Sequence, residues 1–202
     1  MEFIELNDLL NQLYDYDYKF LQVHHTWRPD HADFTGNNHI ALQKGMRDYH
    51  VDTNGWADIG QHISIFPDGK IVTGRDFGKD PVGISNKNKG AFMFEMIGNF
   101  DKGHDVLKGK QLKTALHIVN YFIINNKPVV FHREYSTKSC PGTGIDKDKF
   151  MTLAANIYNI SDWALDSVRK AMYKEVTDGS NPNQFMTLER YLTIADRLGQ
   201  LD

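Results

Sequence analysis

Apolar residues recur along the first 160 residues at spacings that alternate between those of helices and those of strands. Leu6, Leu9, Leu10 and Leu13 fall at helical spacing and predict a helix over residues 7–15. Similar patterns predict further helices over residues 40–50, 112–123 and 146–158, and short apolar runs predict strands over 19–23, 91–98 and 129–131. The runs 63–66 and 70–73 flank Pro67-Asp68-Gly69 and predict a hairpin. Interleaved helices and strands predict an α/β fold in which helices flank a central mixed β-sheet.

The pattern changes near residue 160. Ser161-Asp162-Trp163-Ala164 can cap and begin a helix, Asp178 to Pro182 reads as a turn, and residues 187–198 predict a second helix. About 40 residues of helix–turn–helix are too few for an independent hydrophobic core. We therefore expect a main domain over residues 1–159 and a small C-terminal helical unit over residues 160–202.

Composition restricts the partners. The 202 residues are 41% hydrophobic and 24% charged, and the formal net charge is −3, so no basic excess points to a nucleic-acid partner. The segment Met1 to Asp8 is acidic and lacks the basic start and apolar stretch of a secretory signal. No apolar run approaches the roughly 18 residues of a membrane span. We expect synthesis in the cytoplasm without a signal peptide, and no membrane-spanning segment.

The chain has a single cysteine, Cys140, so this thiol serves packing, nucleophilic attack or metal ligation. Upstream, the strands predicted at 19–23 and 129–131 end in His24-His25 and in His132. Two imidazoles and a thiolate form the three-ligand set of catalytic zinc sites, which keep a fourth position open. Adjacent residues of a strand point to opposite faces, so only one of His24 and His25 can face a shared metal. The competing interpretation is that these are ordinary surface or hydrogen-bonded core histidines.

Two further charged residues, Glu95 and Lys138, are candidates for a catalytic role beside these metal ligands. Glu95 lies inside the apolar strand predicted at 91–98, where burial raises the pKa of a carboxyl group. It either pairs with a Lys or Arg or acts as a general base near neutral pH. Lys138 stands two residues before Cys140, so in an extended loop both side chains lie on one side. It either approaches the substrate of the metal site or is a solvated loop lysine.

Residues 18–150 resemble the zinc-dependent N-acetylmuramoyl-L-alanine amidases, the family shared by phage amidase endolysins and peptidoglycan recognition proteins. The matching motifs occur in the family's order: Val23-His24-His25-Thr26, Gly55-Trp56-Ala-Asp58-Ile-Gly60, Asp68-Gly69, Gly74-Arg75-Asp76, Gly98-Asn-Phe-Asp101 and His132 to Pro141. The resemblance implies that His24, His132 and Cys140 bind Zn²⁺ and that His25 points away as a structural residue. It also implies hydrolysis of the amide bond between N-acetylmuramic acid and L-alanine in bacterial peptidoglycan.

The chain departs from the family pattern in two places. Many members carry a catalytic tyrosine where this chain has Gln61, whereas another branch uses a glutamate at the position of Glu95. The resemblance therefore implies Glu95 as the base and Lys138 as the group that stabilises the oxyanion, and it leaves open whether Gln61 contacts substrate. The segment Gly83-Ile84-Ser85-Asn86 stands where a Gly-x-His motif is usual, which puts substrate contacts from that loop in doubt.

The C-terminal unit resembles one S-layer homology repeat. The matching positions are Ser161 to Ala164, Val176 to Gly179, Phe185 and Thr187-Leu188-Glu189, with a degraded form of the usual Thr-Arg-Ala-Glu signature. The resemblance implies attachment to a secondary cell-wall polymer, and the alternative is a packed helical pair or a dimer contact.

Three functions compete for the whole chain. The leading one is a zinc amidase that serves as a phage or prophage endolysin and acts on the cell wall after its release. The second is a peptidoglycan-binding module without catalysis. The third is a metal-free thiol hydrolase that uses Cys140 and His132.

Overall fold

The structure is a computed structural model and describes residues 1–184 and 188–201. The chain divides into two compact units, residues 1–146 and residues 147–202, which are described separately below. The observed division, after residue 146, lies 13 residues before the boundary that the sequence predicted after residue 159. Phe185 and Thr187, two positions of the S-layer-like pattern, lie outside the described residues.

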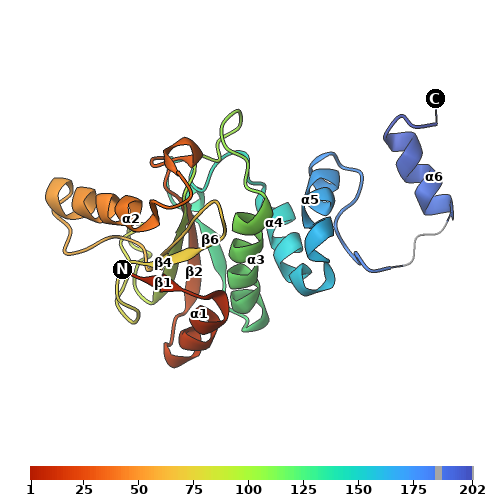
Figure 1. Cartoon of the computed structure of the whole chain (residues 1–202). Coiled ribbons are helices and arrows are strands. Elements are labelled where there is room, and N and C mark those ends of the chain that lie inside the picture. The colour runs from red at the N-terminus through yellow and green to blue at the C-terminus, as the bar shows by residue number, and fades with distance from the viewer. Residues whose placement is uncertain (185–187, 202) are drawn as a thin grey trace. The chain divides into compact units, whose positions relative to one another are not determined.

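The first unit is built on a six-stranded mixed sheet in the order β1-β4-β3-β5-β2-β6, which confirms the predicted fold class. Figure 1 shows helices on either side of this sheet. The central strands β3, β5, β2 and β6 run parallel, whereas β4 is antiparallel to both β3 and β1. The strands are β1 (Phe3–Ile4), β2 (Phe20–His25), β3 (Ile63–Ile65), β4 (Ile71–Thr73), β5 (Ala91–Met96) and β6 (Val129–Phe131). The sequence predicted all of these except β1, a strand of two residues paired to β4.

Helices cover both faces of this sheet. The helices α1 (Leu6–Gln12) and α3 (Gly109–Ile124) pack together on one side, and α2 (His39–Asp48) lies on the other side in Figure 1. The apolar stripe of α3 is buried against the sheet at Leu112, Ala115, Leu116, Val119 and Phe122. This stripe is the periodic pattern that the sequence showed. α2 ends in a π-helical turn over Tyr49–Thr53, which the sequence did not predict.

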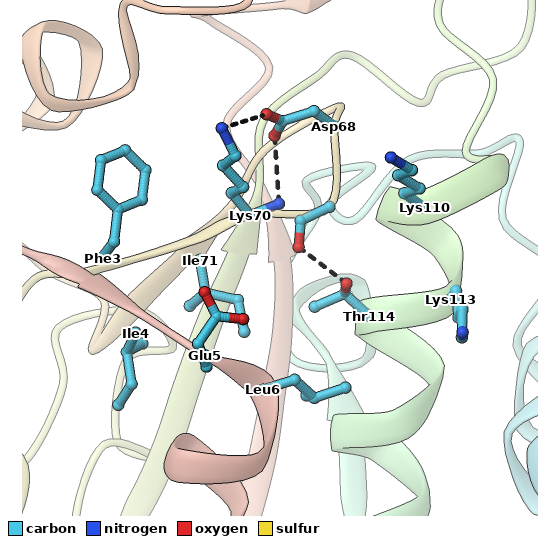
Figure 2. Close-up of a pocket in the computed structure, with 11 residues that line it drawn as sticks. Phe3, Ile4, Glu5, Leu6, Asp68, Lys70, Ile71, Lys110, Lys113 and Thr114 are labelled. Carbon is cyan, nitrogen blue, oxygen red and sulfur yellow. Dashed lines mark hydrogen bonds and ion pairs between the residues drawn. The ribbon is translucent and has the colours of Figure 1, made fainter.

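The β3–β4 turn is tied to the start of α3 (Figure 2). The Thr114 hydroxyl donates a hydrogen bond of 2.9 Å to the Gly69 carbonyl. Asp68 accepts from the backbone amide of Lys70 at 3.2 Å and lies 3.5 Å from its ammonium group. The Asp68 carboxylate also lies 3.0 Å from Nε2 of the buried His39. The Thr114 bond thus holds the turn against α3, and the His39 contact holds it against α2.

The second unit contains α4 (Lys147–Ala155), α5 (Leu165–Tyr173) and α6 (Leu188–Arg197), with short 3₁₀ turns at Ile157–Asn159 and Asp162–Ala164. α4 packs against α5, and Leu153, Leu165 and Met172 on these two helices are buried. Across the residues that the structure describes, no helix combines the length and apolarity needed to cross a membrane.

Candidate metal centre

Parallel pairing of β2 with β6 brings the two predicted histidine ligands together. Val23 pairs with Phe131, so both chains continue past the same end of the sheet into His24 and His132. Cys140 comes back to this end on the loop that follows the 3₁₀ turn His132–Glu134. One donor atom from each of His24, His132 and Cys140 lies within 4.8 Å of the others. The structure thus brings together all three residues that the sequence proposed as metal ligands.

The geometry of these three side chains fits a zinc ion. The Cys140 Sγ lies 3.5 Å from His24 Nδ1, and the two imidazole rings are 4.7 Å apart between centroids. Tetrahedral zinc with bonds of about 2.0–2.3 Å holds its ligand atoms about 3.5 Å apart. The three side chains are 2%, 8% and 7% exposed for His24, His132 and Cys140, so little rotamer freedom remains to be lost on binding. Small side-chain adjustments therefore suffice to close the set around one ion.

Burial keeps the three donors neutral in the metal-free protein. It lowers the pKa of His24 well below its usual value, with further lowering by the neighbouring His132, His25 and Lys138. Burial, followed by the charge of Lys138, also lowers the pKa of His132. Burial raises the pKa of the Cys140 thiol to about 12. Neutral imidazoles are ready ligands, while the thiol loses its proton only when a cation is bound beside it.

The loop that carries Cys140 is held by residues from the end of β5. The Asp101 carboxylate accepts hydrogen bonds from the Ser139 hydroxyl at 3.0 Å and from the Thr143 amide at 2.9 Å. The backbone amide of His25 donates to the Cys140 Sγ at 3.4 Å. The His25 ring turns to Phe100, whose amide donates to His25 Nδ1 at 3.2 Å. His25 is thus held by Phe100, as expected of a structural residue, although it also borders the cleft that contains the metal donors.

Glu95 lies beside the metal donors because its strand pairs with β2 in register. Glu95 is the pairing partner of His24, and paired residues of parallel strands present their side chains to the same face. Within the described residues Glu95 makes no ion pair, which leaves its carboxyl group available. Burial raises the pKa of Glu95 to about 8, although the positive charge of Lys138 acts to lower it. A carboxyl group with such a pKa can both accept and return a proton near neutral pH.

These groups open into one cleft of about 780 Å³. His24, His132, Cys140, Glu95 and the exposed Lys138 all line it. Its walls also carry side chains that the sequence analysis did not assign to the site: Trp27, Tyr49, His50 and Trp56. The His50 and Trp56 rings lie 4.6 Å apart between centroids, and His50 Nδ1 accepts from the Gly60 amide. Of these four residues, only Trp56 lies in one of the family motifs, Gly55 to Gly60. This motif is therefore the one sequence feature that could have indicated this side of the cleft.

The structure places Gln61, which the sequence left open as a substrate contact, away from the cleft. Gln61 is fully buried, and its amide nitrogen donates to the Ser64 hydroxyl at 3.0 Å. It packs beneath α2, near Met46, and is not among the described residues that line the cleft. The sequence could not show this, because strand alternation alone does not say which face of the sheet α2 covers. From the loop with the altered Gly-x-His motif, Gly83 lines the cleft through its backbone.

Fold and site together define a class of protein in which two histidines and a cysteine meet at one end of a mixed sheet, beside a partly buried carboxyl group. A family model described as N-acetylmuramoyl-L-alanine amidase matches residues 14–143, more than half of the chain. The chain belongs to this family, which confirms the resemblance found in its motifs.

Relatives and solved structures agree with this assignment. A peptidoglycan-recognition protein SC2 of Drosophila simulans is 28% identical over 111 residues, which cover 52% of this chain and 59% of the fly protein. A human N-acetylmuramoyl-L-alanine amidase is 28% identical over 138 residues, which cover 62% of this chain and 23% of the human protein. The matched segments thus span less than two thirds of the length of these relatives.

Two solved structures have the same fold. Bumblebee PGRP-SA superposes with a TM-score of 0.56 at 25% identity, covering 65% of this chain and 79% of that one. The Ph2119 endolysin of a Thermus scotoductus bacteriophage gives a TM-score of 0.54 at 20% identity, covering 69% of this chain and 83% of that one.

Proposed function

We propose that the protein is a zinc-dependent N-acetylmuramoyl-L-alanine amidase that cleaves the amide bond between N-acetylmuramic acid and L-alanine in peptidoglycan. The observation that carries this proposal is the convergence of His24, His132 and Cys140 at one end of the sheet. Family membership supports the substrate. The cleft, with Glu95 and Lys138 beside the donors, supports hydrolysis rather than binding alone.

Each side chain has a role in the proposed reaction. When bound by His24, His132 and Cys140, Zn²⁺ supplies a Lewis acid that lowers the pKa of water from about 15.7 towards 7. Glu95 accepts the proton of the attacking water, because burial places its pKa near neutrality. The ammonium group of Lys138 faces the oxygen of the lactyl carbonyl and stabilises its developing negative charge. Glu95 then returns the proton to the amine of L-alanine, which leaves.

The metal-free thiol hydrolase is disfavoured by the state of its nucleophile. A thiol with a pKa of about 12 is almost entirely protonated at neutral pH and is a poor nucleophile. The buried Cys140 is 7% exposed, and this hypothesis gives His24 no role although it lies 3.5 Å from the sulfur. The binding-only module is disfavoured by the presence of all three donors together with a carboxyl group of raised pKa.

The test combines metal analysis with a wall-digestion assay. Purified protein should contain one zinc per chain, and a chelator should abolish the release of amino groups of L-alanine from purified cell walls. Cys140→Ser should lose both zinc and activity. Activity that survives complete zinc removal would favour the thiol hydrolase, whereas zinc and wall binding without release of amino groups would favour the binding module.

For the biological setting, we infer an endolysin of a phage or prophage, made in the cytoplasm and acting on the wall after release. A fold shared with a phage endolysin agrees with this setting. Attachment of residues 160–202 to a secondary cell-wall polymer stays a prediction. It would be tested by comparing the full chain with its Trp163→Ala variant for binding to walls with and without their secondary polymers, because Trp163 is 86% exposed.

A further inference from the structure

Gln22 is a buried amide that contacts the first metal donor. It lies on β2 two residues before His24, so both side chains extend from the same face of the sheet. Gln22 is fully buried, with 0% of its surface exposed. Its Oε1 lies 3.3 Å from His24 Nε2, and its Nε2 lies 2.8 Å from the carbonyl oxygen of Lys87. Both ends of the amide are therefore engaged.

These two contacts determine the protonation of the His24 ring. The Lys87 carbonyl can only accept a hydrogen bond, so the NH₂ group of Gln22 faces it and the amide oxygen faces His24. That oxygen cannot donate, so Nε2 of His24 must carry the ring proton. Nδ1 is then left with a free lone pair, on the side where Cys140 Sγ lies 3.5 Å away.

We propose that Gln22 is a positioning residue that holds His24 in the Nε2–H tautomer and directs Nδ1 to the metal. The proposal rests on the zinc site of the proposed function and adds a residue outside its three donors. A hydrogen bond to the outer nitrogen of a ligand imidazole fixes the ring orientation, and its loss commonly lowers metal affinity 10- to 100-fold.

The segment 83–88 keeps the Gln22 amide in place. A Cβ added at Gly83 would lie 2.5 Å from Gln22 Oε1 and 3.0 Å from His24 Nε2, so only glycine fits against this pair. Asn88 Oδ1 accepts from the amides of Gly83 and Ile84 at 3.0 and 3.1 Å, which fixes the loop next to the Lys87 carbonyl. Through Gln22, a wall of the cleft is thus connected to a metal donor. This gives Gly83 a role even though the loop lacks the histidine of the Gly-x-His motif.

The test compares Gln22→Met with Gln43→Met. Gln43 is a matched control because it is also fully buried and its amide nitrogen donates to a backbone carbonyl, that of Thr73, at 3.1 Å. Gln22→Met loses the hydrogen bond to the Lys87 carbonyl and the contact with His24. Gln43→Met loses the hydrogen bond to Thr73 and a longer one of 3.5 Å to the Val72 carbonyl, neither of which belongs to a metal donor. Competition with a chelator should show a 10- to 100-fold loss of zinc affinity in Gln22→Met and less than about a twofold loss in Gln43→Met. Urea unfolding of the zinc-free variants should show similar destabilisation.

A measurement on the unaltered protein is independent of whether the variants fold. Nitrogen NMR of the imidazole rings should find the His24 proton on Nε2 in the zinc-free protein, and still there when zinc is bound. A proton on Nδ1, or zinc on Nε2, would overturn the proposal. Tight zinc binding by the wild type with equal affinities in the two variants would overturn the role of Gln22 alone. A wild type that binds no zinc would overturn the proposed function as well.

Discussion

Gly142 offers a direct test of how the Cys140 loop is held. Its φ of +118° is unfavourable for any residue with a side chain, and a Cβ there would lie 2.4 Å from the backbone carbonyl of Phe100. Gly142→Ala therefore introduces backbone strain of about 1–3 kcal/mol. It also pushes apart the loop around Gly142 and the loop around Phe100. Two hydrogen bonds join these loops: the Gly144 amide donates to the Phe100 carbonyl at 2.8 Å, and the Thr143 amide donates to the Asp101 carboxylate. Losing these hydrogen bonds costs about 1 kcal/mol each.

We expect Gly142→Ala to lower the free energy of unfolding of the zinc-free protein by about 3–5 kcal/mol in urea titrations, the sum of this strain and the two lost hydrogen bonds. Gly103→Ala is the matched control, because Gly103 also has a positive φ, +90°, but nothing lies within 4 Å of an added Cβ. It should cost only about 1–2 kcal/mol of strain. Gly142→Ala should also weaken zinc binding, since the change lies two residues from Cys140. The reasoning is refuted if the two variants are equally stable and bind zinc equally well.

The remaining predictions concern catalysis and pH. Glu95→Gln should retain zinc but lose about 10²- to 10⁴-fold in wall hydrolysis, and near-normal turnover would remove it as the base. Lys138→Met, also with zinc retained, should lose about 10²- to 10³-fold in turnover, and an unchanged rate would reduce it to a solvated lysine. Burial lowers the pKa of His62 to about 4, and its neutral ring bonds Met93 and Lys79. As pH falls, the His62 ring binds a proton in the unfolded chain near pH 6.5 but in the folded protein only near pH 4. The stability of the zinc-free protein should therefore fall as pH drops from 6.5 to about 4. His62 should account for about 3 kcal/mol of this loss, and a His62→Gln variant with an equally steep profile would contradict that share.

The strands and the metal donors could be predicted from sequence for a common physical reason. Buried parallel strands need continuous apolar runs, and those at residues 19–23 and 129–131 ended in polar residues of unusual chemistry, His24 and His132. Once these two strands are neighbours in a parallel sheet, their following residues meet at one end. Glu95 stood out because a carboxylate in an apolar strand is costly without a role.

Other features depend on tertiary contacts that leave no local pattern. β1 is two residues long and exists only because β4 offers it an edge. Gln61 is buried because α2 covers its face of the sheet, which its motif could not show. Gln22 reads as an ordinary polar residue in a strand until the register places it beside His24 and the Lys87 carbonyl.

The central claim is that one zinc ion is held by two imidazoles and one thiolate. X-ray absorption at the zinc edge of the loaded protein measures this most directly. We expect two nitrogen ligands near 2.0–2.1 Å and one sulfur near 2.3 Å, with a further light-atom ligand. In Cys140→Ser the sulfur contribution should disappear. A zinc spectrum without sulfur in the wild-type protein would contradict the account.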